Sequence, residues 1–309
     1  MKKEIFNFDS NDKKTSLKAV KYIPDNKPKC LLITVHGMCE YIERYDEFAS
    51  FLAKNDIAFY GYDLLGHGDS VSSNEDLGFF SEDDGYLIVQ KDTQKLMEIA
   101  KSEYNDVPCF IMGHSMGSFI VRFFTSMHSN EIAGSIIMGT GMQPVAAVKF
   151  GVLACKTIAL FKGWHHRSKF INSLVIGPYN KKWEPSKTHC EWLSKNEDSN
   201  QKYHDDPKCG YRFTLNGFLT LFKTIEKTLD KNLVGNIRKD LPILLVSGDE
   251  DPVGSCGKEV KAVYDMFKEL GLNNTTMKLY EGDRHEILNE LDKEQVYQDI
   301  LEWINGNLQ

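Results

Sequence analysis

The chain has 309 residues, a length that α/β folds often reach as one unit, so we expect one core with a large insertion. Two independent domains are less consistent with this length. The formal net charge of −7 provides no broad positive field to attract phosphate backbones, which argues against nucleic acid as a partner.

The amino terminus and the cysteines predict a cytoplasmic protein. Two lysines follow Met1, but the sequence turns polar before an apolar stretch of signal-peptide length develops. The seven cysteines are an odd number without C-x-x-C pairs, which favours reduced thiols over a disulfide framework. The histidines and cysteines between residues 165 and 209 fit no zinc spacing, so we expect neither a metal nor a cofactor.

Short apolar runs along the chain predict a mostly parallel, eight-stranded sheet flanked by helices. The first two segments alternate apolar and polar residues, as an antiparallel edge hairpin would, so the sheet should be mixed at one end. The later runs alternate with helix-like stretches, including residues 118–128, 258–270 and 293–305. The predicted strands are residues 4–8, 16–22, 30–35, 57–62, 107–112, 133–138, 242–247 and 276–280.

The strand-helix rhythm is lost between residues 143 and 216, which we interpret as a helical cap inserted between two core parts, residues 1–142 and 217–309. Its apolar stretch Val145 to Phe161 contains two lysines and is shorter than the ~20 residues of a membrane span. We expect a buried cap helix. The alternative is a helix whose apolar face lines an acyl pocket or touches a membrane surface transiently, and we expect substrate to bind within the cap region Val145 to Trp192.

The nucleophile is predicted at Ser115, within the sequence Gly113-His114-Ser115-Met116-Gly117. An apolar strand precedes this G-x-S-x-G motif and a helical stretch follows it, so a sharp turn should project the serine hydroxyl. Larger side chains at Gly113 and Gly117 would collide across so tight a turn.

A serine hydroxyl needs a base, and the base needs an orienting acid, in the chain order Ser, Asp or Glu, His. His285 follows the last predicted strand and precedes the final helix, so it is the predicted base. The turn after residues 242–247 offers the acid. Asp251 is our choice because Pro252 stiffens the backbone beside it, and Asp249 is the alternative.

Two backbone amides should stabilise the oxyanion of an acyl-transfer reaction. One follows the nucleophile, at Met116, and the other lies in the loop after the third strand, at Met38. Met116 also starts a helix, whose positive end favours the developing charge.

Several motifs together resemble the monoacylglycerol lipase and lysophospholipase group of α/β-hydrolases, which overlaps the family described as serine aminopeptidases. They are His36-Gly37-Met38-Cys39-Glu40-Tyr41, Arg44-Tyr45, Tyr62 to Ser70, Gly113 to Gly117, Gly248 to Val253 and Arg284 to Glu290. The resemblance implies the α/β-hydrolase fold, a triad of Ser115, Asp251 and His285, and an oxyanion hole formed by the amides of Met38 and Met116.

The resemblance also implies structural roles for residues around the site. His36 and Glu40 would support the oxyanion loop, and Asp63, His67 and Ser70 would hold the turn after the fourth strand. The chain departs from the family pattern at Cys39 and Tyr41, where glycine and histidine are common, and this bulkier pair is expected to narrow the acyl site.

We expect a serine carboxylic ester hydrolase acting on a lipid-like monoester, such as a monoacylglycerol or lysophospholipid. One alternative is an aminopeptidase, whose cap would need a carboxylate to bind an α-ammonium group. Its candidates are Glu184, Glu191 and Asp205. The other alternative is a non-catalytic ligand-binding protein on the same scaffold. The sequence does not predict the oligomeric state.

Overall fold

The computed structural model describes residues 1–308 and contains one eight-stranded sheet in the order β1-β2-β4-β3-β5-β6-β7-β8. Strands β1, β2 and β4 pair in antiparallel fashion, and β4, β3, β5, β6, β7 and β8 pair in parallel. The mixed sheet with an edge hairpin is therefore confirmed. The strands are β1 (Lys2–Asp9), β2 (Ser16–Ile23), β3 (Cys30–Val35), β4 (Ile57–Tyr62), β5 (Cys109–His114), β6 (Gly134–Met138), β7 (Ile243–Gly248) and β8 (Thr275–Tyr280).

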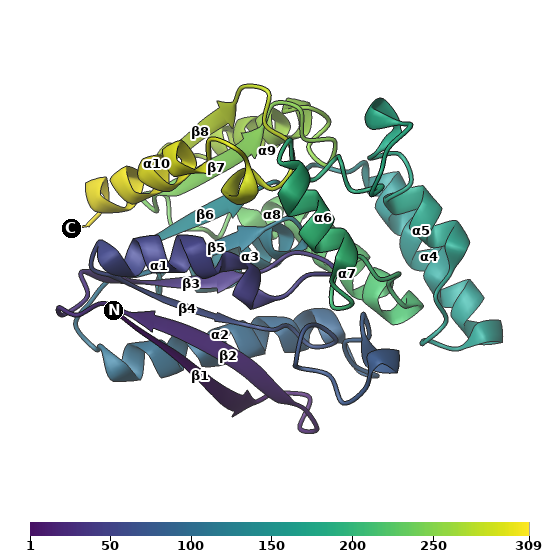
Figure 1. The fold of residues 1–309 in the computed structure, drawn as a ribbon, viewed down its shortest axis with the longest axis horizontal. Helices are drawn as coiled ribbons and strands as arrows, with labels where there is room; N and C mark the ends of the chain where they lie inside the picture. Colours follow the sequence, from purple (N-terminus) through teal and green to yellow (C-terminus); the bar gives the residue numbers. More distant parts are fainter. Residues whose placement is uncertain (309) are drawn as a thin grey trace.

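Helices cover both faces of this sheet (Figure 1). The α-helices are α1 (Asp46–Lys54), α2 (Gly85–Glu103), α3 (Met116–His128), α4 (Val145–Lys162), α5 (Lys169–Val175), α6 (Glu197–Asp205), α7 (Leu215–Thr228), α8 (Lys231–Val234), α9 (Lys258–Glu269) and α10 (Lys293–Gly306). Four short 3-10 helices are η1 (Ile42–Tyr45), η2 (Asn74–Asp76), η3 (Lys181–Trp183) and η4 (Ile287–Asn289).

The two faces of the sheet carry separate apolar clusters. Because successive side chains of a strand point to opposite faces, Leu31 and Ile33 of β3 join one cluster while Leu32 joins the other. The first cluster includes residues of α2, α3 and α9, and the second includes residues of α1 and α10. A sheet covered on both faces explains why its central strands are continuously apolar.

The chain leaves the sheet after β6, forms α4, α5 and α6, and returns through α7, which packs against both α3 and α4. Figure 1 shows α4 and α5 outside the sheet, at the end of the molecule opposite the two termini. The insertion boundary predicted at residue 216 falls at the second residue of α7.

The expectation of a buried helix at Val145 to Phe161 is wrong. Helix α4 forms, but it buries only one side, formed by Val148, Gly151, Cys155 and Ala159. Leu160 and Phe161 are more than 80% exposed, at 83% and 82%. The helix packs on α7 without a second layer above it, which leaves its outer face uncovered. Among residues 1–308, no helix combines the length and apolarity needed to cross a membrane.

Candidate active site

Ser115 lies at the sharp turn between β5 and α3, with φ of 55° and ψ of −120°. Serine rarely adopts a positive φ, so the surrounding structure must impose this conformation. A Cβ atom at Gly113 would lie 2.2 Å from the carbonyl oxygen of Gly117, and one at Gly117 would lie 2.1 Å from that of Val35. Both positions therefore need glycine, as the motif predicts.

Asp251 and His285 meet in the interior. The Nδ1 atom of His285 lies 2.9 Å from Oδ2 of Asp251, and both side chains are buried. Asp251 also accepts hydrogen bonds from the Ser247 hydroxyl and the Val253 amide, at 2.9 and 2.8 Å. Burial opposes ionisation of Asp251, but the facing imidazole and these donors hold the pKa of the carboxyl below its usual value.

Asp249, the alternative acid, lies elsewhere in the same turn. Its Oδ1 atom accepts the Gly282 amide at 2.7 Å and makes no contact with the imidazole of His285. Its role is to join the turns that follow β7 and β8.

Ser115 and His285 line the same cavity. The amide of Ser115 donates to the carbonyl of Met138 at 2.9 Å, and a Cβ atom on the next residue, Gly139, would lie 3.0 Å from Cε1 of His285. The other ring nitrogen of His285, Nε2, has no hydrogen-bond partner within residues 1–308.

The amides of Met38 and Met116 are both unpaired within the described chain, residues 1–308. Met116 is the first residue of α3, where helix geometry leaves the amide without an internal acceptor. Met38 follows Gly37, and a Cβ atom at Gly37 would lie 3.1 Å from the Cβ of Ser115. The two methionines line the cavity beside the serine.

The loop after β4 is held by the residues that the motif predicts. Asp63 accepts the amides of Ile42 and Asp69 at 2.9 and 2.8 Å. Nε2 of His36 accepts the Leu64 amide at 2.9 Å, and the Ser70 hydroxyl accepts the Lys18 amide at the same distance. None of the side chains of Asp63, His36 and Ser70 lines the cavity, and their contacts are structural.

His67 belongs to the same loop and is fully buried among aromatic rings, including His36, Phe80 and Phe213. Its Nδ1 atom lies 2.9 Å from the Leu65 carbonyl oxygen, and Nε2 has no partner within residues 1–308. Burial lowers the pKa of His67 to about 3, so the ring is neutral at physiological pH.

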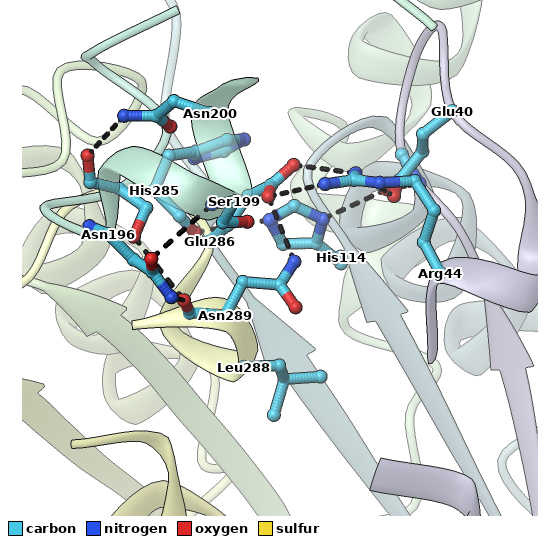
Figure 2. A network of polar contacts seen from close by, with 12 residues as sticks. Glu40, Arg44, His114, Asn196, Ser199, Asn200, His285, Glu286, Leu288 and Asn289 are labelled. Atoms are coloured by element: carbon cyan, nitrogen blue, oxygen red, sulfur yellow. Dashed lines mark hydrogen bonds and ion pairs between the residues drawn. The ribbon is translucent and has the colours of Figure 1, made fainter. Parts of the chain in front are cut away.

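A buried charged network joins the loop after β3, residues 36–41, to the loop of His285 (Figure 2). Arg44 donates to Glu40 at 2.7 Å and to both carboxylate oxygens of Glu286 at 2.7 Å each. Glu40 in turn accepts the Gly37 amide at 2.6 Å. The sequence singles out Glu40 as a loop-stabilising acid, but it does not reveal Glu286, because its partner Arg44 lies 242 positions away.

The network continues into the insertion. The side-chain amide of Asn289 donates to Glu286 at 2.9 Å, and the side-chain amide of Asn196 donates to the Asn289 carbonyl at 3.0 Å. Asn196 also caps α6 by accepting the Ser199 amide (Figure 2). The histidine loop is therefore bonded both to the core and to the insertion.

The cavity above Ser115 has a volume of about 620 Å³, within the range of small-molecule sites. Its walls come from the loop after β3, from α3 and α7, and from α4, α5 and the segment before α6. Trp192 lies against the imidazole of His285, with ring centroids 5.1 Å apart. Phe150 and Leu174 line the cavity and are about half exposed, so the cavity opens at α4 and α5.

The carboxylate, lysine and arginine side chains that line the cavity are all of one sign of charge. No lysine or arginine of residues 1–308 lines it, whereas three carboxylates do: Glu40, Glu259 and Glu286. Arg44 forms ion pairs with Glu40 and Glu286, and Glu259 has no ion-pair partner within the described chain. Glu259 accepts the Met142 amide at 2.9 Å and the Ser255 hydroxyl at 2.9 Å. Sequence reasoning missed Glu259, because it lies eight residues beyond the predicted acid, in α9.

Other candidates from the sequence lie outside the cavity. Glu184, Glu191 and Asp205 are not among its lining residues, so these carboxylates do not reach a substrate beside Ser115. Tyr41 also lies outside it and donates to Asp206 at 2.8 Å.

Cys39 does line the cavity, with a positive φ of 57° where glycine would be unstrained. Its buried thiol donates to the Tyr211 carbonyl.

Known proteins are similar in sequence to this chain over most of its length. The human (Homo sapiens) monoglyceride lipase is 25% identical over 290 residues, which cover 91% of this chain and 84% of that protein. The monoglyceride lipase homolog of Monkeypox virus is 26% identical over 284 residues, covering 91% of each chain.

Solved structures share the fold. A thermostable carboxyl esterase from Bacillus coagulans, in complex with glycerol, superposes with a TM-score of 0.92 at 26% identity over 100% of both chains. A soluble variant of the Saccharomyces cerevisiae monoglyceride lipase with a substrate analog gives 0.78 at 18% identity, over 99% of this chain and 95% of that one. The family model described as "Serine aminopeptidase, S33" matches residues 26–292, so the chain belongs to that family and is an enzyme of the α/β-hydrolase type.

Proposed function

We propose that this enzyme hydrolyses carboxylic monoesters of fatty acids through an acyl-enzyme on Ser115. The observation that carries the proposal is the buried Asp251–His285 pair at the cavity where Ser115 stands in a strained turn. The relatives named monoglyceride lipase and carboxyl esterase support ester substrates.

In the proposed mechanism, Nε2 of His285 takes the hydroxyl proton as Ser115 attacks the ester carbonyl. The amides of Met38 and Met116 stabilise the oxyanion, and the positive end of α3 adds to this. His285 then protonates the leaving alcohol, and water hydrolyses the acyl-enzyme by the same route. Asp251 keeps Nδ1 protonated and stabilises the imidazolium that forms.

We propose that the substrate has a neutral head group and carries no phosphate ester. Phosphates are usually bound by arginine or lysine, and neither type lines the cavity within residues 1–308. Glu259 would repel an anionic head group, but it can accept hydrogen bonds from the hydroxyls of a glycerol moiety. Of the two substrates expected from the sequence, this favours a monoacylglycerol over a lysophospholipid.

We also propose that residues 143–216 form a cap over the ester site and that α4 and α5 contact a lipid surface transiently. Their exposed apolar residues are Val145, Phe150, Leu153, Leu160, Phe161, Phe170 and Leu174. Exposed lysines flank them at 149, 156, 162 and 169, which suits an anionic membrane surface. Because the cavity opens beside Phe150 and Leu174, an acyl chain can enter from that surface.

The proposal is tested with p-nitrophenyl esters of graded chain length, followed by 1-lauroylglycerol and lauroyl lysophosphatidylglycerol at matched concentrations. Wild type should hydrolyse the esters and prefer the lauroylglycerol, and Ser115→Ala should lose at least about 10⁴-fold in kcat. Equal rates for wild type and Ser115→Ala would refute the acyl-enzyme. A preference for the phosphate ester would refute the neutral head group.

The aminopeptidase alternative would now depend on Glu259, the cavity carboxylate without a cationic partner within residues 1–308. Turnover of aminoacyl-β-naphthylamides that is lost in Glu259→Gln, without turnover of esters, would favour it. Labelling of Ser115 by a fluorophosphonate probe would argue against the non-catalytic alternative, since labelling needs an activated serine.

A further inference from the structure

His114, the residue before Ser115, is bonded to two loops of the site. Its Nδ1 atom lies 3.2 Å from Oε1 of Glu40, and its Nε2 atom lies 3.1 Å from the main-chain carbonyl oxygen of His285 (Figure 2). Both partners are acceptors. A neutral imidazole has a single N–H, so one of the two contacts would then set lone pair against lone pair.

A protonated Glu40 could supply the missing proton, but it would then be a poorer acceptor for its other hydrogen-bond donors. Its carboxylate accepts the Gly37 amide at 2.6 Å, the Arg44 guanidinium at 2.7 Å and the Tyr45 hydroxyl at 3.0 Å. Burial disfavours the charged form, but the donors from His114 and Arg44 hold the pKa of Glu40 well below its usual range. Glu40 is therefore an ionised acceptor.

Charge balance leads to the same protonation state. The groups that face the ring of His114 are Glu40, Glu286 and Arg44, with the ring of His285 at a centroid distance of 4.6 Å. One guanidinium against two carboxylates leaves a buried net charge of −1, which a charged His114 neutralises. Two more distant groups leave this balance unchanged: Tyr45 is neutral, and Asp251 lies on the far side of His285, bonded to its Nδ1.

We propose that His114 is a positioning residue that works as an imidazolium, donating one N–H to Glu40 and the other to the His285 carbonyl. In this state it ties the loop of the Met38 amide to the loop of the general base. The inference rests on the proposed function for its catalytic consequence, but the protonation state can be measured independently. Burial lowers the pKa of His114, and the hydrogen bond and charge of Glu40 outweigh this and raise it.

Two other buried histidines provide a contrast. Nε2 of His36 accepts the Leu64 amide at 2.9 Å, so that nitrogen cannot carry a proton, and burial lowers the pKa of His36. His67 has one acceptor, the Leu65 carbonyl, and no hydrogen bond to a carboxylate within residues 1–308. Of the three, only His114 has an acceptor at each ring nitrogen.

The direct test is nitrogen NMR of the wild-type enzyme labelled with ¹⁵N-histidine, with the His114 signals assigned by their loss in His114→Gln. Both ring nitrogens of His114 should be protonated at pH 7, whereas His36, the internal reference, should show one protonated nitrogen. A single N–H on His114 at pH 7 would overturn the proposal. The same spectrum from Ser115→Ala separates this outcome from a failure of the proposed function.

The kinetic test uses Glu286→Gln, which removes a negative charge near His114 without removing a direct contact of its ring. In a plot of kcat against pH, the alkaline limb should move to lower pH by about one unit, because His114 then loses its proton more easily. Glu250→Gln, at a partly exposed position of the Asp251 turn that pairs with Lys182, is the control and should leave the limb in place. A limb that does not move in Glu286→Gln contradicts the proposal.

His114→Gln retains one hydrogen bond and loses the charge. We expect kcat to fall by up to about 100-fold with KM nearly unchanged, because the base is misplaced while the cavity is intact. A purely structural role would instead alter KM and kcat together or leave both unchanged, and either result would count against the proposal.

Discussion

The imidazole of His285 is hydrogen-bonded to Asp251 at 2.9 Å and both side chains are buried, although the two residues lie on separate loops 34 positions apart. Asp251 follows β7 and His285 follows β8, and these strands are parallel neighbours. Parallel pairing brings the carboxyl ends of both strands to one edge of the sheet. A Cβ atom at Gly248 would lie 2.0 Å from the Asp283 carbonyl, so the two turns touch.

Asp251→Asn should lower kcat by about 10⁴-fold on p-nitrophenyl esters with little change in KM. The asparagine amide fits the same space but no longer fixes the proton on Nδ1 or stabilises the imidazolium. Asp249→Asn is the matched control from the same turn, and its kcat should stay within a few-fold of wild type. If the control lost as much activity as Asp251→Asn, the assignment of the acid would be wrong.

The low pKa of His67 predicts that the free energy of unfolding decreases as the pH falls. Its pKa is about 3 in the folded protein, against 6.5 for a solvated histidine, so the unfolded chain binds the proton first as the pH falls. The contribution of the neutral ring is fully present above pH 6.5 and is lost as the pH drops toward 3. The titration of His67 therefore makes the free energy of unfolding about 2 kcal/mol lower at pH 5 than at pH 8.

His67→Phe should remove that pH dependence while retaining the aromatic packing. The variant loses the hydrogen bond to the Leu65 carbonyl at every pH, which lowers its Tm by a constant amount. Because phenylalanine does not titrate, the Tm of the variant relative to wild type should rise by a few degrees between pH 8 and pH 5. Differential scanning calorimetry at the two pH values measures this change. His165→Phe, at an exposed ring, is the control, and an equal shift in both variants would refute the assignment to His67.

Local signals in the sequence were enough to predict the strands, because buried parallel strands are short apolar runs bounded by turns. The observed β3 and β4 have the predicted bounds, and β5 begins two residues later than expected because Pro108 cannot donate to a sheet. The same motifs pointed to Asp251 and His285, which are hydrogen-bonded to each other, and to Ser115, which lines the same cavity as His285.

The remaining features depend on tertiary contacts that leave no local pattern. The exposed face of α4 was misjudged because apolar composition does not reveal whether a second layer covers a helix. Glu286 and Glu259 acquire their roles only from partners on distant elements, Arg44 and Met142. Charged residues are usually solvated, so neither position stood out.

Gly151→Ala should narrow the acyl site. A Cβ atom at this position of α4 would lie 2.6 Å from the ring of Phe222, which lines the cavity from α7. We expect the ring to move toward the cavity, so kcat/KM for a dodecanoyl ester should fall relative to that for a butanoyl ester. Lys156→Ala, on the exposed face of the same helix, should leave the ratio unchanged. A ratio unchanged in Gly151→Ala would place the acyl chain elsewhere.

The apolar surface of α4 predicts lipid-dependent activity. Leu160→Glu combined with Phe161→Glu replaces two side chains that are 83% and 82% exposed, so the folded state should be little affected. Sedimentation with anionic phospholipid vesicles should fall at least several-fold. Two apolar side chains that would insert into the lipid are lost, and two negative charges that the anionic surface repels are added. Turnover of a soluble butanoyl ester should remain at the wild-type rate, while turnover of vesicle-borne monoacylglycerol should fall. Leu291→Glu, at a 69% exposed position outside α4 and α5, is the control, and equal vesicle binding by both proteins would rule out this surface as the membrane contact.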